Sequence, residues 1–182
     1  MSTLAQYTNP ALIVPQLRSR DATAATAELC SVLQRHDRVH DLLPFYNAVI
    51  SHELLSSTAT SPGWALPHAR QWGLPQLCFA LGRAAEPLAW FGQSSQPARL
   101  IFLFAVPESE SAAYLALVSA LARLSQNRRI ADQLLDAPDA NALLEILQRA
   151  TVAAPSRRTS SQEHAAGNPA ALATTTAPIS KT

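Results

Sequence analysis

The sequence lacks the features that assign many chains to a familiar class at once. It has only two cysteines, Cys30 and Cys78, which are far apart and form no CxxC pair, so neither a disulfide framework nor a zinc knuckle is indicated. No apolar run is long enough to cross a membrane. The N-terminus has no positive residue before Arg18, which argues against a secretory signal. We therefore expect a cytoplasmic protein with buried thiols and no direct membrane insertion.

The motifs of several common chemistries are also missing. There is no GxSxG elbow, P-loop or dinucleotide fingerprint, so hydrolase, NTPase and dehydrogenase functions have no support. The formal net charge is +1 and charges of both signs are scattered, so there is no basic stripe of the kind that binds nucleic acid. His36 and His40 have the spacing of a metal-binding pair, but no carboxylate or thiolate completes a site. We predict no metal and no cofactor.

Composition divides the chain into one domain and a tail. The apolar fraction of 48% fits a globular protein, and the length allows one domain with a proper core. After about Thr151 large apolar residues nearly vanish, and Ala, Ser, Thr and Pro dominate. Such a segment cannot bury enough surface to offset its ordering entropy. The sequence therefore predicts a domain over residues 1–150 and a disordered tail over residues 151–182.

Periodicity within the domain predicts helices that alternate with strands. The segment 98–106 is continuously apolar, which is typical of a strand covered on both faces of a sheet. Asp21 is a suitable N-cap, and residues 84–96 have the Pro and Gly punctuation of a loop. The other expected elements are an edge strand or extended arm at 12–17, a strand at 77–83, and helices at about 21–36, 41–54, from 111, 127–135 and from Pro138. In the helix at 41–54 the apolar residues keep the near-helical spacing of one face: Leu42, Phe45, Val49, Ile50 and Leu54.

One stretch, residues 57–70, combines the groups that bind anions. A Ser/Thr-rich turn leads through Pro62 and Gly63 into a short apolar strand, 64–66, which ends at Pro67 and is followed by His68. Hydroxyl groups precede this histidine and the Arg70 guanidinium follows it. A histidine beside a proline is more often an ordinary surface residue. The residues alone thus leave a reactive imidazole and a surface imidazole both open.

Other conspicuous residues have simple structural interpretations. We expect packing residues rather than a platform for sugar at the three tryptophans, Trp64, Trp72 and Trp90. Arg128 and Arg129 suit an exposed helix start. Tyr114 fits a half-buried helix position.

Three ordered blocks of the sequence form a recognisable pattern. The first consists of Ser57, Thr58, Gly63, Ala65, Pro67 and His68, shortly after Glu53. The second is Gln96-Pro97 with the strand to Val106 and Pro107, and the third is the helix that begins near Tyr114, with Leu134 to Ala137 beyond it. With these blocks, over about residues 12–150, the chain resembles the enzyme IIA domain of the fructose/mannitol type, from the bacterial phosphoenolpyruvate-dependent sugar phosphotransferase system, including its nitrogen-regulatory branch. Glu53 occupies the position of a family glutamate.

The chain departs from the family pattern close to this first block. His52 stands where the family commonly has arginine, and Ala59 and Ser61 replace glycines. Tyr114 takes the place of a second histidine that sugar-transporting members often carry. Each change removes a positive charge, a hinge or an imidazole from around the expected phosphoryl site.

The resemblance implies a fold and a function. The fold is an α/β three-layer sandwich, with a mixed central β-sheet and helices on both faces. His68 would accept phosphate from an HPr-like phosphocarrier protein and pass it to a permease IIB domain or a regulated protein. The alternatives are a regulatory interaction module, with phosphorylation of His68 as a signal or absent, and a small-anion binding domain. Candidate phosphate-binding residues are Thr58, Ser57, Gly63, Arg70 and His52, with Tyr114 as a possible second-helix site.

Overall fold

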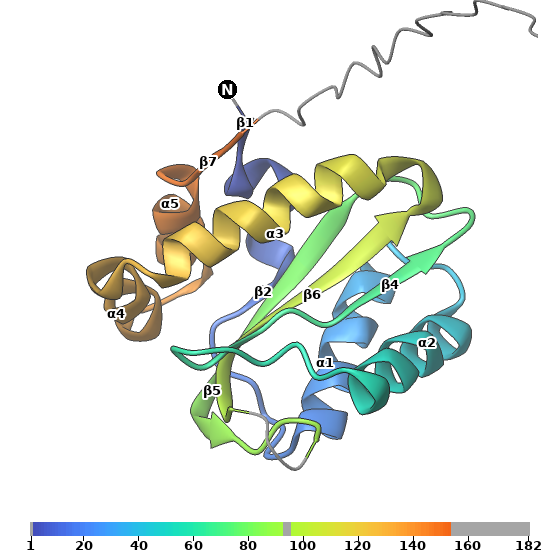
Figure 1. Cartoon of the computed structure of the whole chain (residues 1–182), viewed down its shortest axis with the longest axis horizontal. Helices are drawn as coiled ribbons and strands as arrows, with labels where there is room; N and C mark the ends of the chain where they lie inside the picture. The colour runs from blue at the N-terminus through green and yellow to red at the C-terminus, as the bar shows by residue number, and fades with distance from the viewer. Residues whose placement is uncertain (1, 93–95, 154–182) are drawn as a thin grey trace, which may run out of the picture.

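The structure is a computed structural model that describes residues 2–92 and 96–153. Its centre is a five-stranded mixed sheet, in which β2 is one edge and β3 and β4 together form the other (Figure 1). β5 is antiparallel to β6, whereas β2 is parallel to β5, and β3 and β4 are parallel to β6. The strands are β2 (Ile13–Val14), β3 (Trp64–Ala65), β4 (His68–Gln71), β5 (Cys78–Leu88) and β6 (Ala98–Pro107).

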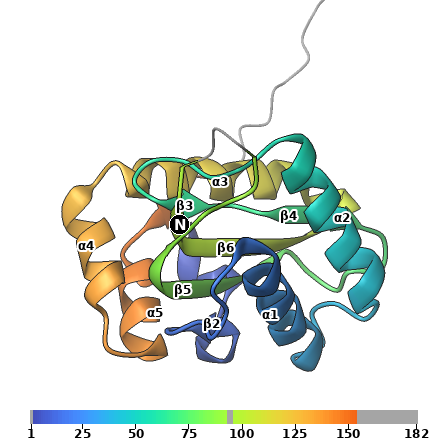
Figure 2. The same ribbon diagram turned by 90° about the horizontal axis from the view of Figure 1, so that it is seen from below.

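Helices cover both faces of this sheet, so the predicted three-layer sandwich is confirmed (Figure 2). β6 alternates between two cores, with Phe102 and Phe104 facing one and Ile101 and Leu103 facing the other. The first core contains residues of α3 (Ser111–Ser125), α4 (Arg128–Asp136) and α5 (Ala140–Gln148). The second contains residues of α1 (Ala22–Arg35) and α2 (Leu42–Leu55). Every residue of β6 except Arg99 is buried, as its apolar run predicts.

Three helix starts are set by side chains that accept backbone hydrogen bonds. Asp21 accepts from the Ala24 N–H at 2.8 Å, as the sequence predicts. Asn127 and Asp139 cap α4 and α5 in the same way. Short 3-10 turns, at Leu4–Tyr7, Pro10–Leu12 and Glu108–Glu110, connect the other elements.

The C-terminal boundary of the fold lies slightly beyond the predicted one. β7 (Thr151–Val152) pairs antiparallel with β1 (Ser2–Thr3), and Val152 is buried. Two residues assigned to the tail therefore belong to the folded unit. The remainder of the predicted tail, residues 154–182, lies outside the described residues.

Two local predictions are wrong for identifiable reasons. β5 continues to Leu88, within the predicted loop, through an irregularity in its register after Arg83. Pro87 is tolerated in that irregular part, where a missing N–H need not interrupt the ladder. In α2, Leu54 is 66% exposed because the buried positions follow the four-residue spacing of Phe45, Val49 and Glu53.

None of the helices in the described part of the chain has the length and apolar character needed to span a membrane.

Candidate functional site

The outer edge of the sheet holds His68. β3 and β4 pair with β6 in one continuous register, Trp64 with Leu100 and His68 with Phe104. Leu66 and Pro67 interrupt the strand, but the Pro67 carbonyl still accepts a 2.9 Å hydrogen bond from the Phe104 N–H. His68 therefore begins a second short strand, whereas the sequence predicts that it follows the end of one. The backbone of His68 is fixed because β4 pairs with the buried strand β6.

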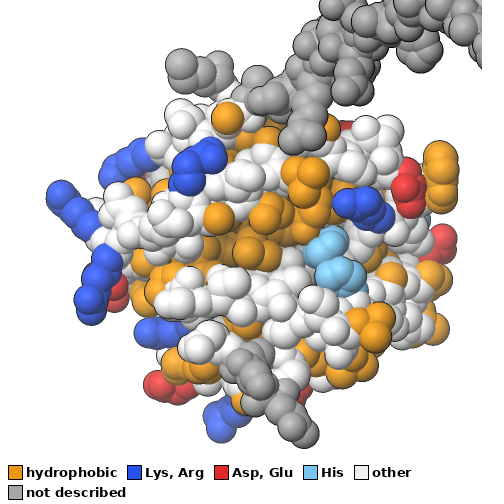
Figure 3. Space-filling model, in the orientation of Figure 1, with side chains coloured by type: hydrophobic (Ala, Val, Ile, Leu, Met, Phe, Trp, Pro, Cys, Tyr) orange, Lys and Arg blue, Asp and Glu red, His pale blue; other side chains and the backbone are white. Residues whose placement is uncertain are grey.

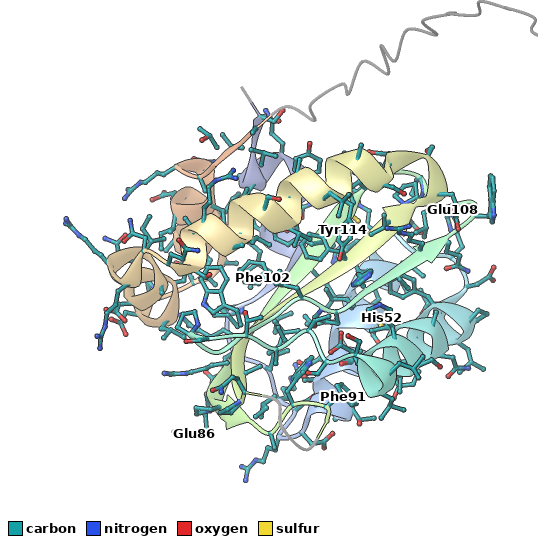
Figure 4. All side chains as sticks on the ribbon, in the orientation of Figure 1. His52, Glu86, Phe91, Phe102, Glu108 and Tyr114 are labelled. Atoms are coloured by element: carbon teal, nitrogen blue, oxygen red, sulfur yellow. The ribbon has the colours of Figure 1, made fainter. Side chains whose placement is uncertain are left out.

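Three elements bring aromatic and imidazole rings together around His68. His52 from α2 lies with its ring centroid 4.3 Å from that of His68, at an interplanar angle of 60°. Tyr114 from α3 lies on the other side, with centroids 4.9 Å apart. Figure 4 shows His52 and Tyr114 on opposite sides of β4. His68 is half-buried between them.

A surface pocket of about 430 Å³ opens beside these rings. It is lined by His52, His68 and Arg70, together with Ala48 and Ala69. In Figure 3 the histidine side chains lie beside basic and hydrophobic side chains on this face of the molecule. The structure thus brings together four of the predicted site residues, because Tyr114 contacts the His68 ring. An exposed guanidinium and two imidazoles around a pocket are suited to an anion.

The electrostatics favour a neutral His68 and a neutral Tyr114. Burial lowers the pKa of His68 from its ordinary value, and the neighbouring His52 and Arg70 lower it further, against the opposing effect of a hydrogen bond to Leu66. Burial raises the pKa of Tyr114 to about 12, so its phenol is uncharged at neutral pH. Nδ1 of His68 lies 3.4 Å from the Leu66 carbonyl oxygen. Because a carbonyl can only accept, this contact favours the neutral tautomer that carries its hydrogen on Nδ1, which leaves the lone pair on Nε2.

The other predicted phosphate-binding residues make hydrogen bonds within the loop that precedes His68. The Thr58 hydroxyl accepts from the Leu66 N–H at 3.0 Å, and the Ser57 hydroxyl accepts from the Ala59 N–H at 3.4 Å. Gly63 has φ +98°, and its N–H donates to the Thr60 carbonyl at 2.9 Å in a tight turn. None of these residues lines the pocket beside His68. In the structure they shape the loop.

Sequence reasoning gave Glu53 no role in the site. Its side chain is fully buried on α2, and its Oε2 accepts from the Thr58 N–H at 3.0 Å and from the Trp90 indole at 2.8 Å. Its Oε1 is buried without a hydrogen-bond partner among the described residues. The sequence signal that could have identified Glu53 is its position, because a charged residue there continues the four-residue spacing of the buried Phe45 and Val49.

The simple interpretations of the other residues are mostly confirmed. Trp64 and Trp90 are buried packing residues, but Trp72 is 83% exposed, so the prediction for it is wrong: it lies in the turn after β4, away from either core. Both cysteines are free and buried. Arg128 and Arg129 are exposed at the start of α4.

The chain is similar to known proteins in both sequence and structure. The chain is 27% identical over 133 residues to the PTS system fructose-specific EIIABC component of Bacillus subtilis, a match that covers 73% of this chain but only 21% of that protein. It is 28% identical over 138 residues to the Nitrogen regulatory protein of Bradyrhizobium diazoefficiens, covering 76% of this chain and 90% of that one.

Its fold matches solved IIA structures. One is the complex of enzyme IIAMTL and phosphorylated enzyme IIBMTL from Escherichia coli, with a TM-score of 0.64 and 15% identity over 77% of this chain and 96% of that one. The family model described as "Phosphoenolpyruvate-dependent sugar phosphotransferase system, EIIA 2" matches residues 6–150. The chain belongs to this family of phosphotransferase-system IIA domains.

Proposed function

We propose that this chain is a phosphoryl carrier that accepts phosphate on Nε2 of His68 from an HPr-like phosphocarrier and passes it to a IIB domain or to a regulated protein. Membership of the IIA family supports a phosphoryl carrier role in the phosphotransferase system or its nitrogen-regulatory branch. The observation that carries the proposal is the contact between Nδ1 of His68 and the Leu66 carbonyl. It leaves Nε2 as the nucleophile.

Phosphoryl transfer requires little of the protein beyond positioning and the stabilisation of charge. The Nε2 lone pair forms a bond to phosphorus while the phosphorus–nitrogen bond of the donor phosphohistidine breaks, and the donor imidazole keeps the electron pair. No proton leaves His68, because Nδ1–H remains hydrogen-bonded to Leu66. The lowered pKa of His68 keeps the ring neutral, and therefore nucleophilic, at cytoplasmic pH.

Neighbouring residues would stabilise the transferred group. Arg70 and His52 line the same pocket as His68, where the guanidinium supplies positive charge and the imidazole a polar ring nitrogen for the phosphoryl oxygens. Tyr114 covers the other side of the ring and excludes water from it. Thr58, Ser57 and Gly63 act indirectly by shaping the loop.

A protein donor and acceptor suit the surroundings of His68. Large apolar side chains are exposed at the end of α2, after β4 and next to Tyr114 on α3, which is where a partner's surface would bury them. They are Leu54, Leu55, Trp72 and Leu115.

The test is incubation with phosphoenolpyruvate, enzyme I and HPr. We expect an adduct that is labile in acid and stable in alkali, formed by the wild type and lost in His68→Ala. His36→Ala and His40→Ala, which remove exposed imidazoles outside the pocket, are the matched controls and should retain the label. Label retained by His68→Ala would overturn the assignment.

A regulatory module is the second candidate. His52 replaces the permanent positive charge of the family arginine with an imidazole beside His68. A signal protein needs a long-lived phosphorylated state rather than rapid turnover, and the similarity to a nitrogen regulatory protein favours this possibility.

A further inference from the structure

Burial of the Glu53 carboxylate carries a large desolvation free energy. A carboxylate loses the solvation of water when it is fully buried, and it is stable there only if hydrogen bonds replace that water. The two hydrogen bonds that it accepts within the described part of the chain both go to Oε2, and they come from two different segments. A leucine could have continued the apolar stripe of Phe45 and Val49 without this cost. The contacts of Glu53 therefore point to a role other than core packing.

The two donors belong to segments that are far apart in the sequence. Thr58 lies in the loop that leads from α2 to His68, and Trp90 follows β5, 37 residues after Glu53. The Trp90 side chain is buried and packs edge to face on Phe91, so the indole N–H is held in one place. One carboxylate oxygen thus ties α2, the loop and the segment after β5 together.

A continuous path of hydrogen bonds leads from Glu53 to the His68 ring. The Thr58 N–H donates to Glu53, the Leu66 N–H donates to the Thr58 hydroxyl, and His68 Nδ1 faces the Leu66 carbonyl. Thr58 and Leu66 each contribute two polar groups to this path. A shift of Thr58 would therefore move the carbonyl that orients the imidazole.

We propose that Glu53 is a positioning residue: with Trp90 it holds Thr58 and Leu66 so that the Leu66 carbonyl fixes the tautomer of His68. Glu53 need not touch the phosphoryl group. Its effect on transfer rests on the proposed function, but its effect on the tautomer does not, so the two can fail separately. Groups that orient a reactive imidazole through its second nitrogen act in this way.

The first experiment measures the tautomer without any phosphorylation. Nitrogen-15 NMR of the full chain, labelled at histidine, distinguishes a protonated Nδ1 from a protonated Nε2 at pH 8. We expect the wild type and Glu53→Gln, which keeps an acceptor oxygen, to hold the hydrogen on Nδ1. Glu53→Ala and Trp90→Phe should show a mixture of tautomers at His68. Trp64→Phe, the same change at a buried indole outside this path, is the control and should resemble the wild type.

The second experiment measures the rate of phosphoryl transfer over a series of concentrations of labelled HPr, which gives both the rate at saturation and the half-saturating concentration. Misplacing a reactive group in this way should slow Trp90→Phe about tenfold or more, with the half-saturating HPr concentration unchanged. Glu53→Gln should retain most of the wild-type rate. Trp90→Phe keeps an aromatic ring, so the proposal remains testable even if Glu53→Ala does not fold. A wild-type tautomer pattern in both Glu53→Ala and Trp90→Phe would overturn it, as would Glu53→Gln behaving like Glu53→Ala.

Discussion

The two helices that flank His68 hold it in different ways. α2 contributes polar groups, the imidazole of His52 and the buried carboxylate of Glu53. α3 contributes the Tyr114 ring, which packs on both His68 and Phe104 above an apolar core. The polar side sets the orientation and charge around the imidazole, and the apolar side removes water from it. Substitutions on α3 should therefore mainly lower the free energy of unfolding, whereas substitutions on α2 should mainly change the rate of phosphoryl transfer.

The largest effect on stability is expected at Tyr114. Tyr114→Ala removes a side chain that is only 5% exposed, and loss of a buried aromatic ring costs about 3–5 kcal/mol of unfolding free energy. Tyr114→Phe keeps the ring contacts with His68 and Phe104 and should lie within about 1 kcal/mol of the wild type. Urea denaturation measures both.

The neighbouring residue Leu115 is the control for this comparison. It is 58% exposed on the same helix, and Leu115→Ala should change stability by no more than about 0.5 kcal/mol. If Tyr114→Phe were as destabilising as Tyr114→Ala, the hydroxyl rather than the ring would hold α3 to the site, and the contrast between the two helices would be lost.

A smaller effect, on rate, is expected on the α2 side. His52→Arg restores a permanent charge in the pocket and should speed phosphoryl transfer from HPr, by about tenfold if it acts as one added stabilising donor of modest strength. A time course with labelled HPr at matched protein concentration measures this. His40→Arg adds the same charge at an exposed position outside the pocket and should have no effect.

The absence of any acceleration in His52→Arg would also be informative. A wild type that equilibrates within seconds, together with an unchanged rate in His52→Arg, would mean that His52 does not limit transfer. An ordinary carrier of a sugar pathway would then be the better description, and the regulatory alternative would lose its main support.

The sequence predicted most of this architecture because its signals are local. The apolar run of β6, the Asp21 cap and the Pro67-His68 pair can each be recognised within a few residues. The extension of β5 could not be predicted, since its pairing with β6 across an irregular register outweighs the loop-like Pro87. Leu54 was misplaced because apolar residues occur on several sides of α2, and only the folded chain shows that the stripe of Phe45, Val49 and Glu53 is the buried one.

The site was predictable only in part, for a related reason. His68, His52 and Arg70 lie close together in sequence or on neighbouring elements, so their proximity followed from the family pattern. The position of Glu53 depends on Trp90, 37 residues away in a stretch expected to be a loop. Thr58 was expected to bind oxygen, but it lies inside a hydrogen-bonded path that only the folded chain displays.

The smallest expected effect concerns the pH dependence of stability at His68. The folded pKa is lowered, by burial first and then by His52 on α2 and Arg70 on β4, whereas the unfolded pKa is about 6.5. Below pH 6.5 the unfolded chain therefore binds a proton that the folded chain resists, and stability falls until the folded pKa is reached; above pH 6.5 the contribution disappears. His68→Gln removes this contribution, so its melting temperature should decline less than that of the wild type between pH 7.5 and pH 5. His40→Gln, at an exposed position, should decline as the wild type does. Parallel declines in His68→Gln and the wild type would mean that His68 is no harder to protonate when folded, and that the apolar side of the site does not desolvate it.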